Sequence, residues 1–258
     1  MILNVNGKAL HTLDPVPRGT EKAPSLLFIH GAGGNGELWE EQAGFFEGKH
    51  SAFRLDLPGH GRSESPGEES IHAYAKWVRL CSEKLFSRKP FVLVGHSMGG
   101  AIVLDLAHNP QEGLKGIVLV GSGAKLSVTR AIFQMLSENP EAFFETLDRF
   151  AFSSTAPGTL KERVVRLTRQ CPPSVIFNDF KACDLFDMRD RLPEIALPSL
   201  VLCGEEDQLT PVKYSRYLHE HMTSSRLVVI PHGGHMVMAE QPDPVNKAIQ
   251  AFLEPLGQ

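Results

Sequence analysis

Little in this sequence points to a metal site, a redox pair or a secreted scaffold. The 258 residues contain only four cysteines, Cys81, Cys171, Cys183 and Cys203, and none lies in a Cys-x-x-Cys pair or a His/Cys cluster. This spacing excludes the usual zinc and redox-dithiol motifs, so we expect no metal and no cofactor. The absence of a pairing pattern favours a reducing compartment and hence a cytoplasmic protein.

Long hydrophobic runs and an excess of positive charge are also missing. The apolar runs, such as 116–120, have the length of strands and fall far short of a membrane helix. The first residues carry no basic stretch followed by a long apolar one, so we expect no signal peptide. The formal net charge of −4 gives no footprint for nucleic acid or an anionic membrane. The expected partner is a small-molecule substrate, bound without membrane insertion by a monomer or a homodimer.

What the chain does contain is a regular alternation of short apolar runs with amphipathic stretches. An Asn-Gly pair at residues 6–7 predicts a hairpin at the start of the chain. The apolar runs predict strands at 25–30, 50–55, 91–94, 114–120, 200–203 and 226–230. The amphipathic stretches predict helices at 37–46, 71–86, 98–108, 212–221 and 244–253. Such alternation predicts an α/β fold, with a mostly parallel sheet covered by helices on both faces.

The alternation stops in the middle of the chain. From about residue 125 to residue 192 there is no buried strand pattern, and helices are predicted at 130–137, 141–150, 160–170 and 175–183. We therefore predict a core domain made of residues 1–123 and 193–258. Residues 124–192 are predicted to form a helical cap inserted into that core domain.

A Gly-His-Ser-Met-Gly motif at residues 95–99 lies between a predicted strand and a predicted helix. A serine on such a turn takes strained backbone angles, and a Cβ at either flanking glycine would collide with adjacent backbone. The turn lifts the hydroxyl above the sheet at a helix N-terminus. We therefore predict that Ser97 is a nucleophile and that the N–H of Met98 faces the developing oxyanion. The alternative is a Gly-Ser turn without chemistry.

A serine nucleophile needs an adjacent base, and histidine is the natural one. Functional groups gather beyond the carboxyl ends of parallel strands. His235 comes five residues after the last predicted strand and follows two glycines that allow a sharp turn. We predict that His235 is the base. His232, in the same loop, is its competitor.

The histidine in turn needs an acid that fixes its tautomer. Three carboxylates, Glu205, Glu206 and Asp207, follow the predicted strand at 200–203. Asp207 is favoured because the next helix begins just after it, although the same position suits a helix cap without chemistry. The chain order Ser97, Asp207, His235 is the order expected of one class of hydrolases.

A glycine-rich loop, His-Gly-Ala-Gly-Gly-Asn-Gly, follows the first long strand at residues 30–36. It lacks the Gly-Lys-Ser/Thr of a P-loop and the spacing of a dinucleotide fingerprint. Backbone amides aimed at an oxyanion fit this loop better than a phosphate cradle does. We predict that the loop supplies the second oxyanion donor.

These motifs resemble the α/β-hydrolase fold superfamily, and in particular its cap-bearing serine esterases, over nearly the whole chain. The segments that carry the resemblance are 30–34, 56–63, 95–100, 204–207 and 234–235. The resemblance implies an eight-stranded, mostly parallel sheet flanked by helices. It implies that Ser97, Asp207 and His235 are the catalytic residues and that the N–H groups of Ala32 and Met98 form the oxyanion hole.

The resemblance has two further implications. Residues 56–63 would form a structural loop beside the active site, with Asp56 and Arg62 held in hydrogen bonds. Ser97 excludes the chemistry of haloalkane dehalogenases and epoxide hydrolases, which use an aspartate nucleophile. The resemblance does not identify a substrate.

Eight of the fifteen phenylalanines lie in the predicted cap: Phe133, Phe143, Phe144, Phe150, Phe152, Phe177, Phe180 and Phe186. Most of them are expected to form the core of the cap, but some should line a cleft beneath it and favour an apolar acyl group or ring. We take Phe133, Phe143 and Phe144 as candidates for this pocket. The sequence thus predicts a serine hydrolase that cleaves a small, rather hydrophobic carboxylic ester through an acyl-enzyme. A carbon–carbon bond hydrolase, thioesterase or lactonase with the same triad, or a non-catalytic ligand receptor, remain the alternatives.

Overall fold

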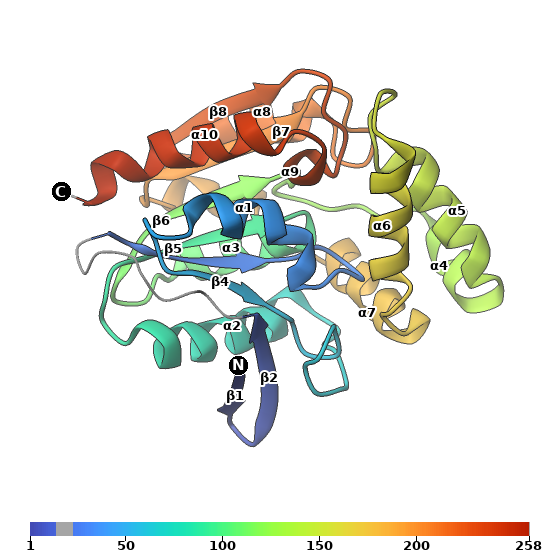
Figure 1. Cartoon of the computed structure of the whole chain (residues 1–258), viewed down its shortest axis with the longest axis horizontal. Coiled ribbons are helices and arrows are strands. Elements are labelled where there is room, and N and C mark those ends of the chain that lie inside the picture. The colour runs from blue at the N-terminus through green and yellow to red at the C-terminus, as the bar shows by residue number, and fades with distance from the viewer. Residues whose placement is uncertain (14–22, 258) are drawn as a thin grey trace.

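An eight-stranded sheet forms the centre of the computed structural model, which describes residues 1–13 and 23–257 (Figure 1). The strands are β1 (Ile2–Val5), β2 (Lys8–Leu13), β3 (Ser25–Ile29), β4 (Ala52–Leu55), β5 (Phe91–His96), β6 (Leu114–Val120), β7 (Ser199–Gly204) and β8 (Ser225–Ile230). Their order in the sheet is β1-β2-β4-β3-β5-β6-β7-β8. The hairpin β1–β2 pairs antiparallel, as does β2 with β4, and all other pairs are parallel. The predicted fold class is confirmed.

Helices cover both faces of the sheet because its central strands place apolar side chains on both faces. Leu27 and Ile29 of β3 pack with α2 (Ile71–Phe86) and α3 (Met98–His108), whereas Leu26 and Phe28 pack with α1 (Glu40–Phe46) and α10 (Pro242–Leu253). Successive side chains of a strand point to opposite faces, so a fully apolar strand builds two cores. α8 (Val212–His221) lies between β7 and β8 in the chain.

The predicted boundaries of helices and strands hold for the long periodic segments. They shift where a capping hydrogen bond sets the start of a helix. The helix predicted at 37–46 is divided into a 3-10 turn, η1 (Gly36–Trp39), and α1, because the Asn35 side chain accepts a hydrogen bond from Glu37 N at 3.0 Å and starts the turn early. The short α9 (Val237–Glu240) and the 3-10 turns η2 (Arg189–Glu194) and η3 (Glu254–Gly257) were not predicted, because they are too short to show a period. Within residues 1–13 and 23–257, no helix is both long and apolar enough to cross a bilayer.

Four helices occupy the chain between β6 and β7: α4 (Arg130–Glu138), α5 (Pro140–Phe150), α6 (Gly158–Thr168) and α7 (Pro173–Asp184). We call these four helices the insertion. They lie together at one side of the molecule, beside the sheet (Figure 1). They share a small apolar cluster of their own, formed by Leu136, Phe143, Phe144, Cys171, Val175 and Ile176.

Candidate active site

Ser97 lies on a strained turn between β5 and α3. Its backbone angles are φ 53° and ψ −115°, in a region that non-glycine residues seldom adopt. A Cβ at Gly95 would lie 2.2 Å from the backbone oxygen of Gly99, and one at Gly99 would lie 2.4 Å from the backbone oxygen of Ile29. The serine is held in this turn by its own N–H, which donates to Val120 O at 2.9 Å. Only glycine at positions 95 and 99 leaves room for backbone segments that lie this close to one another.

Asp207 and His235 form a buried pair beside Ser97. Asp207 Oδ2 lies 2.9 Å from His235 Nδ1, and the two residues are 4% and 5% exposed. Burial by itself would raise the pKa of Asp207, but its contacts with His235 and Thr210 hold that pKa well below its usual range. The carboxylate therefore stays ionised at neutral pH and keeps the imidazole proton on Nδ1. This tautomer leaves Nε2 able to accept a proton.

The second oxygen of Asp207 organises the turn that leads to α8. Asp207 Oδ1 accepts from the backbone N–H groups of Leu209 at 2.9 Å and Thr210 at 2.8 Å, and the Thr210 hydroxyl donates to Oδ2 at 2.8 Å. The sequence left open whether this aspartate orients a histidine or caps a turn. In the structure it does both: Oδ2 faces His235, and Oδ1 accepts from the two backbone N–H groups of the turn.

The competing residues in these loops lie elsewhere. Glu205 is exposed, and Glu206 accepts from the backbone N–H and the hydroxyl of Ser154, both at 2.9 Å. The side chain of His232 is 72% exposed and lies 3.7 Å from Glu206. Neither glutamate faces His235, and both glutamates and His232 are absent from the wall of the cavity beside Ser97.

His96, the residue before Ser97, contacts the loop of His235. Its Nε2 donates to the backbone oxygen of His235 at 3.0 Å, and the two rings are 4.7 Å apart. Burial and the nearby His235 lower the pKa of His96 to about 3, so its ring is neutral. A neutral donor at this point holds the His235 loop without adding a charge beside the His235 ring.

The two predicted oxyanion donors lie at the same site. The Met98 N–H is at the first position of α3, and Ala32 lies in the cavity wall. Among the described residues, no protein acceptor faces the N–H of Ala32 or of Met98. Ser97 Oγ also makes no hydrogen bond within the part of the chain that the structure describes. These groups are available to a substrate, and catalytic hydrogen bonds often tighten only when one is bound.

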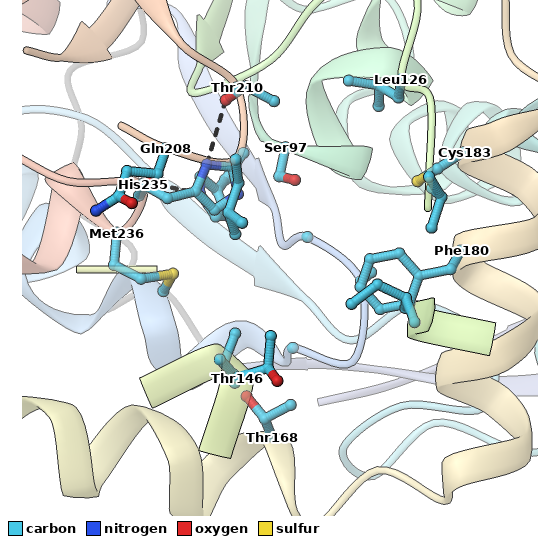
Figure 2. Close-up of a pocket in the computed structure, with 18 of the residues that line it drawn as sticks. Ser97, Leu126, Thr146, Thr168, Phe180, Cys183, Gln208, Thr210, His235 and Met236 are labelled. Carbon is cyan, nitrogen blue, oxygen red and sulfur yellow. Dashed lines mark hydrogen bonds between the residues drawn. The ribbon is translucent and has the colours of Figure 1, made fainter. Parts of the chain in front are cut away.

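A cavity of about 350 Å³ opens over Ser97. Figure 2 shows Leu126, Cys183 and Phe180 on one side of the serine, Met236 and Gln208 near His235 on the other, and Thr146 and Thr168 opposite. Its wall is mainly apolar. Burial raises the pKa of the Cys183 thiol, which therefore stays protonated and contributes only apolar surface.

The predicted pocket phenylalanines divide between the cavity and other contacts. Phe143 lines the cavity, together with Phe180, which the sequence did not single out. Phe144 shares the cluster of the insertion with Phe143 but does not line the cavity, and it lies under the guanidinium of Arg169. Phe133 does not line the cavity either and packs against Phe177. Phe143 and Phe144 are neighbours on one helix and point about 100° apart, and of the two only Phe143 lines the cavity.

The loop at 56–63 is tied to the sheet as the resemblance implied. Asp56 accepts from Gly36 N at 2.8 Å, from Arg62 N at 3.0 Å and from the His11 ring at 2.8 Å. Arg62 thus takes part through its backbone. Across the described residues no group of three or more His, Cys, Asp or Glu side chains is placed to hold a metal ion.

A serine, an aspartate and a histidine, in this chain order and at the edge of an eight-stranded, mostly parallel sheet, define a hydrolase of the α/β type. Residues 26–248 match the Alpha/beta hydrolase family, and the chain belongs to that family. It is thus a hydrolase.

Relatives cover almost the whole chain. A pimeloyl-[acyl-carrier protein] methyl ester esterase from Vibrio atlanticus (strain LGP32) is 24% identical over 253 residues, which cover 90% of this chain and 95% of that protein. A solved thermophilic esterase is 32% identical with a TM-score of 0.88, over 100% of this chain and 98% of that one. The enol-lactonase from Burkholderia xenovorans LB400 shares the fold, with a TM-score of 0.90, 22% identity and coverage of 98% and 100%.

Proposed function

We propose that this protein is a serine hydrolase that cleaves a small, rather hydrophobic carboxylic ester through an acyl-enzyme at Ser97. The observation that carries the proposal is the buried contact of 2.9 Å between Asp207 and His235 beside a serine on a strained turn. A buried carboxylate paired with a histidine in this way prepares the imidazole to accept a proton from the serine. The esterases among its relatives support the same reaction class.

The residues of the site divide the reaction into two steps. In the first, Ser97 Oγ bonds to the ester carbonyl carbon while His235 Nε2 takes the serine proton and returns it to the departing alcohol. The negative charge that develops on the carbonyl oxygen is stabilised by the N–H groups of Ala32 and Met98. In the second step water, activated by His235, releases the acid from Ser97.

The same chemistry assigns the two sides of the cavity. Because His235 protonates the leaving alcohol, the alcohol must lie on the side of His235 and Met236. The acyl group then lies on the opposite side, against Leu126 and Phe180 (Figure 2). A cavity of about 350 Å³ is at the small end of the range for ligand pockets, which is about 300–1,000 Å³. An apolar acyl group of modest size fits this description.

We further propose that the insertion, within residues 124–192, is a cap domain that selects the substrate and moves to admit it. Its helices supply Ile132, Phe143, Val164 and Phe180 to the cavity wall. A cap of this kind excludes water and supplies apolar contacts. The proton transfers take place on the remainder of the chain, which carries the eight-stranded sheet and which we call the sheet domain.

Hydrolysis of p-nitrophenyl acetate, butyrate, hexanoate and octanoate, measured beside an acyl thioester, tests the proposal. We expect the short esters to be the best substrates and Ser97→Ala to lose about 10³-fold or more in kcat while remaining folded. Mass spectrometry of the quenched enzyme should detect the acyl group on Ser97. A Ser97→Ala variant that keeps more than about a tenth of the activity would exclude this serine as the nucleophile.

A further inference from the structure

A buried ionic cluster joins the insertion to the sheet domain, away from Ser97. At its centre is Asp179 of α7, which is fully buried. Its Oδ2 accepts from the backbone N–H of Gly33 at 2.8 Å and lies 2.8 Å from His60 Nε2. Its Oδ1 accepts from the Tyr74 hydroxyl at 2.6 Å. One carboxylate of the insertion therefore meets three groups of the sheet domain.

The geometry makes His60 the cationic partner of Asp179. Its Nε2 faces the carboxylate and its Nδ1 lies 3.0 Å from the backbone oxygen of Pro58. The Pro58 oxygen and an ionised Asp179 carboxylate can only accept, so with this carboxylate both ring nitrogens donate and the ring carries a positive charge. Burial alone would lower the pKa of His60, but the Asp179 carboxylate outweighs burial and raises this pKa well above 6.5.

This ion pair takes no direct part in the chemistry. His60 and Asp179 have fully buried side chains, and neither they nor Tyr74 line the cavity over Ser97. Buried ion pairs add little net stability compared with apolar residues of similar size. What this pair does supply is a fixed acceptor for one particular backbone amide, that of Gly33.

That amide belongs to the turn that carries Ala32. Gly34 N donates to Gly31 O at 3.1 Å, Gly33 has φ +66° and Ala32 keeps a negative φ, which together define a type II turn. Type I and type II turns differ by a flip of their central peptide, here the one between Ala32 and Gly33. A flip would turn the Ala32 carbonyl toward the Asp179 carboxylate. The hydrogen bond to Gly33 N thus selects one of the two turn geometries.

We propose that Asp179 is a positioning residue for the oxyanion hole, because its hydrogen bond to Gly33 N anchors the residue next to Ala32 and so limits the movement of the Ala32 N–H in the turn. The inference rests on the proposed function, in which Ala32 is an oxyanion donor. Asp56 holds the other end of the same loop from within the sheet domain, through Gly36 N at 2.8 Å. The middle of the loop depends on the insertion.

Two matched double variants separate positioning from stability. His60→Leu with Asp179→Leu removes both charges and the acceptor for Gly33 N, and leaves apolar side chains of similar size. His60→Leu with Asp179→Asn also removes both charges but keeps an oxygen that can accept from Gly33 N. Tyr74→Phe serves as a control, since it removes one hydrogen bond to Asp179 and leaves the acceptor in place.

The double leucine variant should lose about tenfold in kcat, with little change in KM. Outright loss of one oxyanion donor costs about 10²- to 10³-fold, and a loosened donor should cost less. The asparagine variant should lose clearly less than the leucine variant, and Tyr74→Phe should stay within about twofold of the wild type. Equal losses in the two double variants would overturn the inference, because only the asparagine variant keeps an acceptor for Gly33 N.

A second readout does not depend on ester turnover. A fluorophosphonate forms a bond from Ser97 Oγ to phosphorus, expels fluoride and passes the serine proton to His235, while charge develops on the phosphoryl oxygen in the oxyanion hole. The labelling rate should fall in the double leucine variant by the same factor as kcat. If the wild type is labelled but hydrolyses no ester, the proposed function fails and the labelling rates still decide the role of Asp179.

Should the double leucine variant not fold, Asp179→Glu addresses the same question. It keeps the charge and moves the carboxylate by one methylene away from the position that suits Gly33 N. We expect its labelling rate to fall at least about threefold while Tyr74→Phe keeps the wild-type rate. A wild-type rate in folded Asp179→Glu would overturn the inference.

Discussion

Replacing Asp207 by asparagine should abolish most of the activity through the tautomer of His235. The amide oxygen of the new side chain can occupy only one of the two carboxylate positions. Oδ1 accepts from the N–H groups of Leu209 and Thr210, so the amide oxygen is needed there. The amide NH₂ would then face His235 Nδ1, which could meet it only as an acceptor. The ring proton would move to Nε2, where it blocks proton transfer from Ser97.

The magnitude follows from the contacts that would have to be broken. To restore the reactive tautomer, the variant must either leave two donors face to face at Nδ1 or rotate the amide and turn its NH₂ toward Leu209 N and Thr210 N. Loss of a charge-assisted hydrogen bond costs about 1.5–3 kcal/mol, and a buried unsatisfied donor costs about 1–3 kcal/mol more. The sum of about 2.5–6 kcal/mol corresponds to about 10²- to 10⁴-fold in kcat.

The assay is steady-state hydrolysis of p-nitrophenyl acetate by folded Asp207→Asn. Glu205→Gln and Glu206→Gln are the matched controls, since each makes the same chemical change in the same loop without facing His235. We expect both controls to stay within about twofold of the wild type. The reasoning is refuted if Asp207→Asn keeps more than about a tenth of kcat, or if either control loses as much as Asp207→Asn.

Three further predictions concern stability and specificity. Burial, reinforced by neighbouring histidines, lowers the pKa of His30 to about 4 and that of His96 to about 3. The unfolded chain therefore binds more protons below pH ~6.5. The free energy of unfolding should fall by about 1.4 kcal/mol per pH unit for each histidine as the pH drops toward 4. Urea titrations that give the same free energy of unfolding at pH 7 and at pH 5 would contradict this prediction. Gly95→Ala would place a Cβ 2.2 Å from the backbone oxygen of Gly99. The variant should therefore lose more than about 3 kcal/mol in its free energy of unfolding, or fail to fold. Wild-type stability would exclude this close approach of the backbone at Gly95 and Gly99. Phe180→Ala should shift the preference toward longer acyl groups by about tenfold in relative kcat/KM. Phe133 does not line the cavity, so Phe133→Ala should leave this preference unchanged. Identical acyl-length profiles in the two variants would contradict the placement of the acyl group against Phe180.

The sheet domain could be predicted because its strands and helices repeat at clear periods. The helices predicted at 98–108 and 212–221 and the strand predicted at 114–120 have the bounds of α3, α8 and β6. The motif residues Ser97, Asp207 and His235 could be nominated because their loops follow strands whose ends meet at one edge of the sheet. Short elements such as α9 escaped, since four residues are too few to show a helical period.

The insertion could not be predicted beyond its helices, because helical periodicity does not say which neighbour a face will meet. Phe144 and Phe180 look alike in the sequence and both pack in or against the cluster of the insertion, yet only Phe180 lines the cavity. Asp179 looks like an ordinary polar residue of an amphipathic helix. Its partner His60 is 119 positions away in the chain, a separation that no local pattern can report.

The two roles assigned to the insertion differ in how they should affect catalysis. The side chains that line the cavity, such as Phe180, touch only part of the substrate, so changing them alters the relative rates of different esters. The hydrogen bond from Gly33 N to Asp179 acts through a donor that every ester would use, so loosening it should lower kcat for all esters by one factor. Substrate preference could therefore change through the cavity side of the insertion without loss of rate, provided that α7 keeps Asp179 in contact with Gly33 N, beside Ala32.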